Sequence, residues 1–82
     1  MIQILIADDH QLIRDAWAMI LGRDRRFKII GGCSTSTETV RMCRKLRPDI
    51  LLLDIHIGPS NGIEAAKKIR SISPATGIIA AQ

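Results

Sequence analysis

Three aspartates that directly follow short apolar runs are the residues of this sequence best suited to chemistry. Asp8 and Asp9 follow the run at residues 2–7, and Asp54 follows the run at 50–53. If the two runs are neighbouring parallel strands, three like charges meet at one edge of a sheet. They persist there only when a cation or a proton neutralises them. Carboxylate ligands without a thiolate favour a hard divalent ion such as Mg²⁺, beside which a carboxylate can attack a phosphoryl group.

Each aspartate alone also has a simpler interpretation. Asp8 can cap the helix that follows it, and Asp54 can start a turn, because aspartate is common at both places. The three together, each at the end of an apolar run, favour a site. His10 and His56 lie close by in the sequence and make a transition-metal site conceivable. A lone imidazole beside a helix start or a loop is more often a surface residue.

Four short apolar runs have the length and the β-branched content of strands. They span residues 2–7, 27–33, 50–53 and 77–81. The third is apolar throughout, as suits a strand covered on both faces. Helix-like segments separate the runs, so the order βαβαβαβ predicts a parallel, doubly wound α/β sheet with right-handed crossovers. In such sheets the working site lies beyond the carboxyl ends of the strands, where the aspartates fall.

Three helices are predicted from apolar residues at helical spacing. Their apolar faces are Leu12, Ile13, Ala16, Trp17, Ile20 and Leu21 in the first, Val40, Cys43 and Leu46 in the second, and Ile63, Ala66 and Ile69 in the third. Gly22 is expected to end the first helix in the left-handed conformation, and Thr35 with Glu38 to open the second as a capping box. Pro48 and Pro74 end the second and third helices.

The composition is that of one small globular domain with an aliphatic core. The chain has 82 residues, of which 46% are hydrophobic and 24% charged, and Trp17 and Phe27 are its aromatic residues. Cys33 and Cys43 are too few for a disulfide scaffold and are expected to be small core residues. No run approaches the roughly 18 apolar residues of a membrane helix, and the amino terminus does not resemble a signal peptide. The sequence therefore predicts a cytoplasmic protein with no membrane partner.

An excess of basic residues raises one further functional class, and an aspartate nucleophile with Mg²⁺ raises another. Twelve Lys and Arg against eight Asp and Glu give a net charge of +4, which permits a basic nucleic-acid-binding module. The sequence has no helix-turn-helix signal, zinc-ligand spacing or aromatic interleaving, and charge runs usually lie on solvated helix faces. A hydrolase with an aspartate nucleophile would need a second acid two residues later, where this chain has His56. We therefore expect that this chain is not an enzyme.

Three segments together resemble the receiver domain of bacterial response regulators, above all those that precede a LuxR/NarL-type output domain. They are ILIADDH at residues 4–10, PDILLLDI at 48–55 and NGIEA at 61–65. The resemblance runs from residue 2 to residue 81 and implies a flavodoxin-like fold of strand order 2-1-3-4-5 when complete.

The same resemblance implies a role for each acidic residue. Asp54 would accept a phosphoryl group from a sensor histidine kinase and become an aspartyl phosphate. Asp9, Asp54 and the backbone carbonyl of His56 would bind Mg²⁺ directly, and Asp8 would hold it through water. The phosphorylated domain would control transcription through a DNA-binding output domain that residues 1–82 do not include.

The sequence departs from the family pattern at two places. Pro59 stands one position later than the usual proline, and Ile57 takes the place of the usual methionine. The Ser/Thr expected at the end of the fourth strand falls on Gln82, and the family's lysine, fifth strand and last two helices are absent. Residues 1–82 are thus expected to be the N-terminal part of a receiver domain. An exposed fourth-strand edge predicts self-association, so a truncated remnant acting only by self-association is the alternative function.

Overall fold

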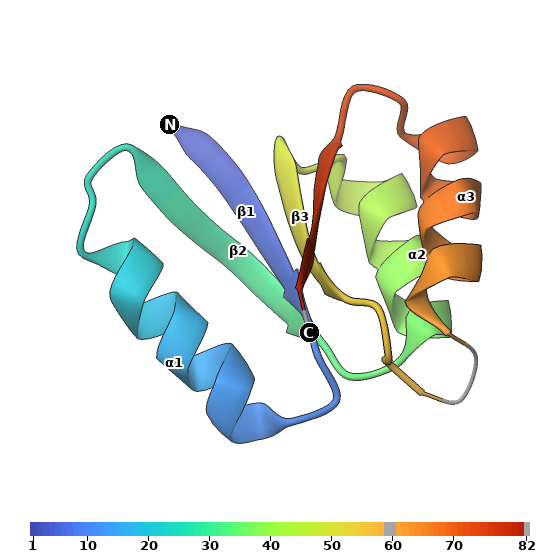
Figure 1. The fold of residues 1–82 in the computed structure, drawn as a ribbon. Coiled ribbons are helices and arrows are strands. Elements are labelled where there is room, and N and C mark those ends of the chain that lie inside the picture. Colours follow the sequence, from blue (N-terminus) through green and yellow to red (C-terminus); the bar gives the residue numbers. More distant parts are fainter. Residues whose placement is uncertain (59–60, 82) are drawn as a thin grey trace.

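The computed structural model describes residues 1–58 and 61–81, which form four parallel strands and three helices (Figure 1). Along the chain these are β1 (Ile2–Ala7), α1 (Gln11–Gly22), β2 (Phe27–Cys33), α2 (Ser36–Leu46), β3 (Ile50–Asp54), α3 (Gly62–Ile72) and β4 (Gly77–Ala81). The order in the sheet is β2-β1-β3-β4, and all neighbouring pairs are parallel. The predicted α/β fold and its element order are confirmed.

Helices cover both faces of this sheet. Figure 1 shows α1 on one face and α2 with α3 on the other. The buried core cluster comprises Leu5, Ala7, Cys33, Cys43, Leu51, Leu53, Ile57, Ala65 and Ile69. β1 and β3 occupy the middle of the sheet and are buried over most of their length, as the continuous apolar run at 50–53 predicted. None of the helices in the described residues is long and apolar enough to cross a bilayer.

The first helix differs from its prediction at both its end and its apolar face. Gly22 is the last helical residue and does not have a positive φ, because the chain continues in a right-handed conformation at Arg23. Leu12 is 82% exposed, and none of the residues of α1 is fully buried. The physical reason is that, in the described part of the chain, α1 packs mainly against β1 and β2, so its wide apolar stripe extends past the surface that covers it.

Capping side chains define the start of the other two helices. The Glu38 N–H donates to Thr35 Oγ1 at 3.1 Å, as predicted, although the Glu38 carboxylate accepts from Ser34 N–H instead of Thr35 N–H. The Glu64 N–H donates to Asn61 Oδ1 at 3.1 Å. In α3 the predicted face is wrong at Ile63, which is 52% exposed. The helix instead turns Gly62, Ala65 and Ile69 inward, because Gly62 packs directly against the backbone after β3.

Thr76, directly before β4, is bonded to the loop between α2 and β3, and its loss should be measurable. Its buried Oγ1 donates to Pro48 O at 2.7 Å and lies 2.7 Å from Ser73 Oγ. Thr76→Val keeps the shape but leaves both partners unsatisfied, so the free energy of unfolding should fall by about 1–3 kcal/mol in urea titrations. Ser71→Ala, which removes an exposed hydroxyl, should cost less than about 0.5 kcal/mol. Equal losses in the two variants would contradict this role.

The two thiols are free and buried, and their reactivity should follow from that burial. Desolvation raises the pKa of Cys33 and of Cys43 to about 11. Because the thiolate is the nucleophile, alkylation near neutral pH should be roughly 100-fold slower in the folded chain than in urea, by mass spectrometry. The folded state holds these protons more tightly than the unfolded state, so stability should fall as pH rises above about 9. Equal alkylation rates in the two states would show that the thiols are exposed.

Candidate functional site

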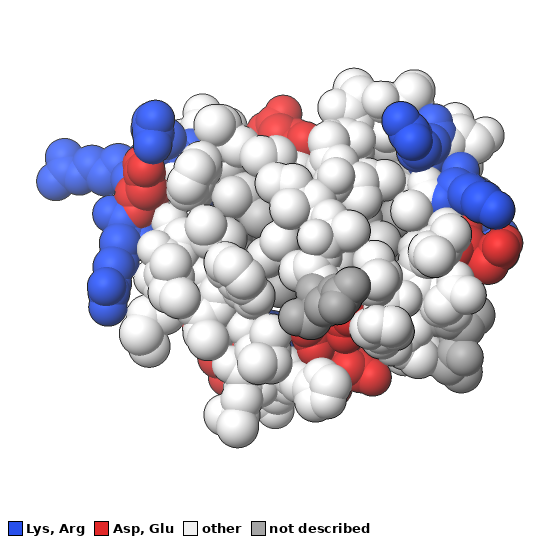
Figure 2. Space-filling model, viewed as in Figure 1, with Lys and Arg blue, Asp and Glu red and all other residues white. Residues whose placement is uncertain are grey.

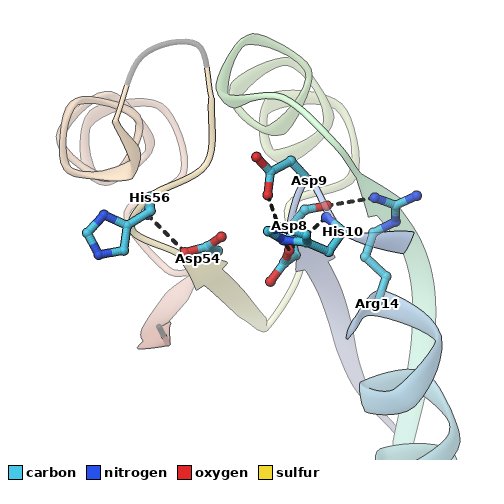
Figure 3. Close-up of polar contacts among 6 residues, drawn as sticks. All are labelled: Asp8, Asp9, His10, Arg14, Asp54 and His56. Carbon is cyan, nitrogen blue, oxygen red and sulfur yellow. Dashed lines mark hydrogen bonds and ion pairs between the residues drawn. The ribbon is translucent and has the colours of Figure 1, made fainter. Parts of the chain in front are cut away.

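The carboxyl ends of β1 and β3 bring the predicted acidic residues together. Parallel pairing of Ala7 with Leu53 places the residues that follow them side by side. One ligand atom from each of Asp8, Asp9, His10 and Asp54 lies within 4.8 Å of the others. The close-up in Figure 3 shows these side chains at one edge of the sheet. The convergence expected from the strand ends is therefore observed.

Asp54 is the most enclosed of these carboxylates. It is the last residue of β3 and only 8% exposed. Its Oδ1 accepts from His56 N–H at 2.9 Å, and its carbonyl accepts from Ile57 N–H at 3.1 Å. Asp54 thus starts a turn, as the simpler interpretation held. The same turn also holds the Asp54 carboxylate beside Asp8 and Asp9. Asp54 can therefore start the turn and also belong to a chemical site.

Asp8 is held by hydrogen bonds through both its backbone and its side chain. Its N–H donates to Cys33 O at 3.0 Å, and its carbonyl accepts from Arg14 Nη1 at 2.7 Å. Its Oδ1 accepts from His10 N–H at 2.8 Å. The N-cap of α1 is His10, which has no side-chain capping bond. Asp8 therefore orders the turn that precedes the helix and does not cap the helix itself.

His10 belongs to the acidic group, which sequence reasoning did not favour. Its Nδ1 lies 2.9 Å from Asp8 Oδ1 and 2.9 Å from Asp9 Oδ1. The hydrogen bond with Asp8 and the charge of Asp9 raise the pKa of His10. The imidazole therefore holds a proton more readily than a free histidine does. The sequence feature that could have identified His10 as part of the group is that it directly follows Asp8 and Asp9 at the end of a strand.

His56, by contrast, does not bring its imidazole into the site. Its backbone N–H binds Asp54, while its ring points away and is exposed (Figure 3). Two histidines therefore do not converge on one metal. Ile57, which takes the place of the family's usual methionine, is fully buried in the core. Pro59 and Gln82 lie outside the described residues, so the expectations placed on them stay predictions.

The donor set fits a hard divalent cation. Three carboxylates meet in a small space beside one imidazole, and they offer the oxygen ligands that Mg²⁺ prefers. Within residues 1–58 and 61–81, no lysine or arginine forms an ion pair with Asp8, Asp9 or Asp54. A buried carboxylate beside bound Mg²⁺ is also a competent nucleophile toward phosphorus.

Comparisons with known proteins agree with this geometry. LiaR of Bacillus subtilis (strain 168), a transcriptional regulatory protein, is 38% identical over 69 residues, covering 84% of this chain and 33% of that protein. A protein-glutamate methylesterase/protein-glutamine glutaminase of Paramagnetospirillum magneticum is 30% identical over 80 residues, covering 98% of this chain and 23% of the enzyme. This chain therefore spans a third or less of either relative.

A solved structure and a family model identify the domain. The crystal structure of a LuxR-family two-component response regulator from Aurantimonas sp. SI85-9A1 superposes with a TM-score of 0.89 at 27% identity, covering 95% of this chain and 56% of that chain. Residues 4–81 match the model of the response regulator receiver domain. Since that match covers nearly the whole sequence, the chain belongs to the receiver domain family of two-component response regulators.

Proposed function

We propose that this domain is a phosphoacceptor in which Asp54 receives a phosphoryl group from a sensor histidine kinase. The observation that carries the proposal is a nearly buried carboxylate at the end of β3 that meets Asp8 and Asp9 within 4.8 Å. Asp9, Asp54 and the His56 carbonyl would bind Mg²⁺ directly, and Asp8 would hold it through water. In a longer protein, an output domain would convert phosphorylation into control of transcription, as the regulatory relatives suggest.

The turn after β3 prepares Asp54 for this reaction. The His56 N–H holds Oδ1 at 2.9 Å and so orients the other carboxylate oxygen. That oxygen would attack the phosphorus of a phosphohistidine, forming an O–P bond as the N–P bond breaks, and the histidine nitrogen leaves with the bonding electron pair. When bound, Mg²⁺ supplies charge stabilisation on the transferred oxygens. Asp8 and Asp9 would hold that charge in place.

The proposal is tested by intact mass after incubation with MgCl₂ and acetyl phosphate. The wild-type chain should gain one phosphoryl group, and Asp54→Asn should gain none because its amide is not a nucleophile. Asp15→Asn is the matched control, since Asp15 is an exposed carboxylate on α1 with no ion pair in the described part of the chain. An adduct that survives Asp54→Asn, or that never forms on the wild type, would contradict the proposal.

Self-association is a second candidate function, favoured by two exposed apolar features. α1 exposes Leu12, Met19 and Ile20, and Ile79 is exposed on β4, which lies at the edge of the described sheet. An unpaired strand edge can pair with a second copy. Sedimentation velocity of the wild type and Ile79→Lys decides this candidate: an oligomer that the lysine disrupts supports it, and a monomeric wild type excludes it.

Direct nucleic-acid binding is not proposed. Figure 2 shows Lys and Arg at two separated places on the face in view, with white surface between them. Binding to a phosphate backbone is favoured by a continuous basic stripe or patch. The basic residues seen there fit the solvated helix faces and turns expected from the sequence.

A further inference from the structure

We propose that Arg14 is a positioning residue, whose guanidinium fixes the peptide group between Asp8 and Asp9 and thereby aims the Asp9 carboxylate into the site. The inference rests on the proposed phosphoacceptor function and deepens it. Arg14 Nη1 donates to Asp8 O at 2.7 Å, reaching back from α1 to the turn after β1 (Figure 3). The residue belongs to none of the motifs that drew attention in the sequence.

The bond matters for Asp9 because a peptide unit is planar. The carbonyl of Asp8 and the N–H of Asp9 belong to the same plane, so a bond that fixes the carbonyl fixes the direction in which Asp9 continues. Within residues 1–58 and 61–81, the Asp9 backbone makes no hydrogen bond of its own. Its carboxylate meets His10, whose imidazole is 70% exposed. Arg14 therefore provides the part-buried contact that holds the peptide unit before Asp9.

Gly32 in β2 provides the space in which Arg14 lies. A Cβ built at Gly32 would be 3.3 Å from Arg14 Cδ and 3.5 Å from its Nε. Glycine is not needed there for its conformation, because none of the described glycines has a positive φ. A glycine within a strand often marks a close approach of another group. Here the stem of Arg14 crosses the bare backbone at the end of β2 on its way to Asp8.

Charge and position predict opposite effects of Arg14 on metal binding. A guanidinium near three carboxylates repels an incoming cation, so by charge alone its removal would tighten Mg²⁺ binding. If Arg14 orients Asp9, its removal loosens a ligand and weakens binding instead. Arg14 binds a backbone carbonyl, which leaves the carboxylate oxygens free for a metal. Weaker Mg²⁺ binding after removal of Arg14 therefore indicates that Arg14 orients Asp9, whereas tighter binding indicates that it acts only through its charge.

The experiment is a calorimetric Mg²⁺ titration of Arg14→Met, which keeps the stem and removes the donor, and of Gly32→Val, which displaces the stem and keeps the charge. Both should weaken Mg²⁺ affinity by roughly tenfold, the usual effect of losing a group that orients a metal ligand. Arg14→Lys should recover part of the loss. Arg23→Met removes an exposed cation about 13 Å along α1 and should leave the affinity unchanged. Unchanged or tighter Mg²⁺ binding in Arg14→Met or in Gly32→Val overturns the proposal.

A measurement without metal tests the role of Arg14 independently of the proposed phosphoacceptor function. In ¹⁵N–¹H spectra without metal, the Asp9 amide signal should move and broaden in Arg14→Met. The Ile55 amide, which donates to Ala81 O, should not change. An unmoved Asp9 signal overturns the role of Arg14. A wild type that neither binds Mg²⁺ nor accepts phosphoryl overturns the phosphoacceptor function, while the Asp9 signal still decides whether Arg14 orders the turn.

Discussion

Gly62→Ala should destabilise the domain by about 1–3 kcal/mol and should lower phosphoryl acceptance at the same time. A Cβ at Gly62 would lie 2.8 Å from Asp54 O and 2.9 Å from Ile55 Cα. Both are backbone atoms, so neither can rotate aside as a flexible side chain would. The Gly62 N–H also donates to Ile55 O at 2.8 Å, and the added methyl group would strain this bond. Because the displaced backbone carries Asp54, the damage reaches the proposed phosphoryl acceptor.

Gly22→Ala is the matched control for this prediction. Nothing lies within 4 Å of a Cβ at Gly22, and its φ is not positive. Alanine in a helix is favoured over glycine, so this variant should be up to about 1 kcal/mol more stable than the wild type. Urea midpoints and the mass adduct from acetyl phosphate measure both effects. Similar midpoints in the two alanine variants would show that the Gly62 backbone contact does not constrain the fold.

Asp9→Asn should separate metal binding from folding. Its carboxylate is 39% exposed, and the contact it loses is with an exposed imidazole, so metal-free stability should change little. Mg²⁺ bound to the folded chain stabilises it by mass action, by about 2.7 kcal/mol when the ion is present at 100 times its dissociation constant. The asparagine variant lacks a charged ligand and should lose most of that gain.

Thermal unfolding in EDTA and in saturating MgCl₂ measures this difference. The wild type and Asp15→Asn should both unfold at a higher temperature with Mg²⁺, and Asp9→Asn should show almost no shift. A full Mg²⁺-dependent shift in Asp9→Asn would remove Asp9 from the ligand set. A wild type without any shift would show that the acidic group binds no cation under these conditions.

The strands could be predicted from the sequence because their signal is local. Each apolar run has strand length, and the structure places all of them in one parallel sheet. The helix faces were less predictable, since burial depends on what packs against a helix. Leu12 and Ile63 belong to apolar stripes yet face solvent. Gly22, at the end of α1, does not take the left-handed conformation expected of it. The residue that does is Arg47, which follows α2 and has a φ of 45°.

The candidate site was predictable to the extent that it depends on strand ends. Asp8, Asp9 and Asp54 follow their apolar runs directly, so parallel pairing alone brings them together. The parts that depend on turn geometry were missed. His10 enters the group through the turn after β1, and Arg14 binds a backbone carbonyl, which is an acceptor that no sequence pattern reveals.

The central place of β1 also bears on how the chain is made. Ile4 pairs with Ile29 on one side and with Ile50 on the other, and β1 precedes both partner strands in the chain, so it is synthesised before either of them. An unpaired strand of this kind is open to aggregation, and such parallel pairing is slow. Charged residues beside an apolar strand suppress aggregation. Asp8 and Asp9 directly follow β1, so two charged residues adjoin this apolar strand before Asp54 has been translated.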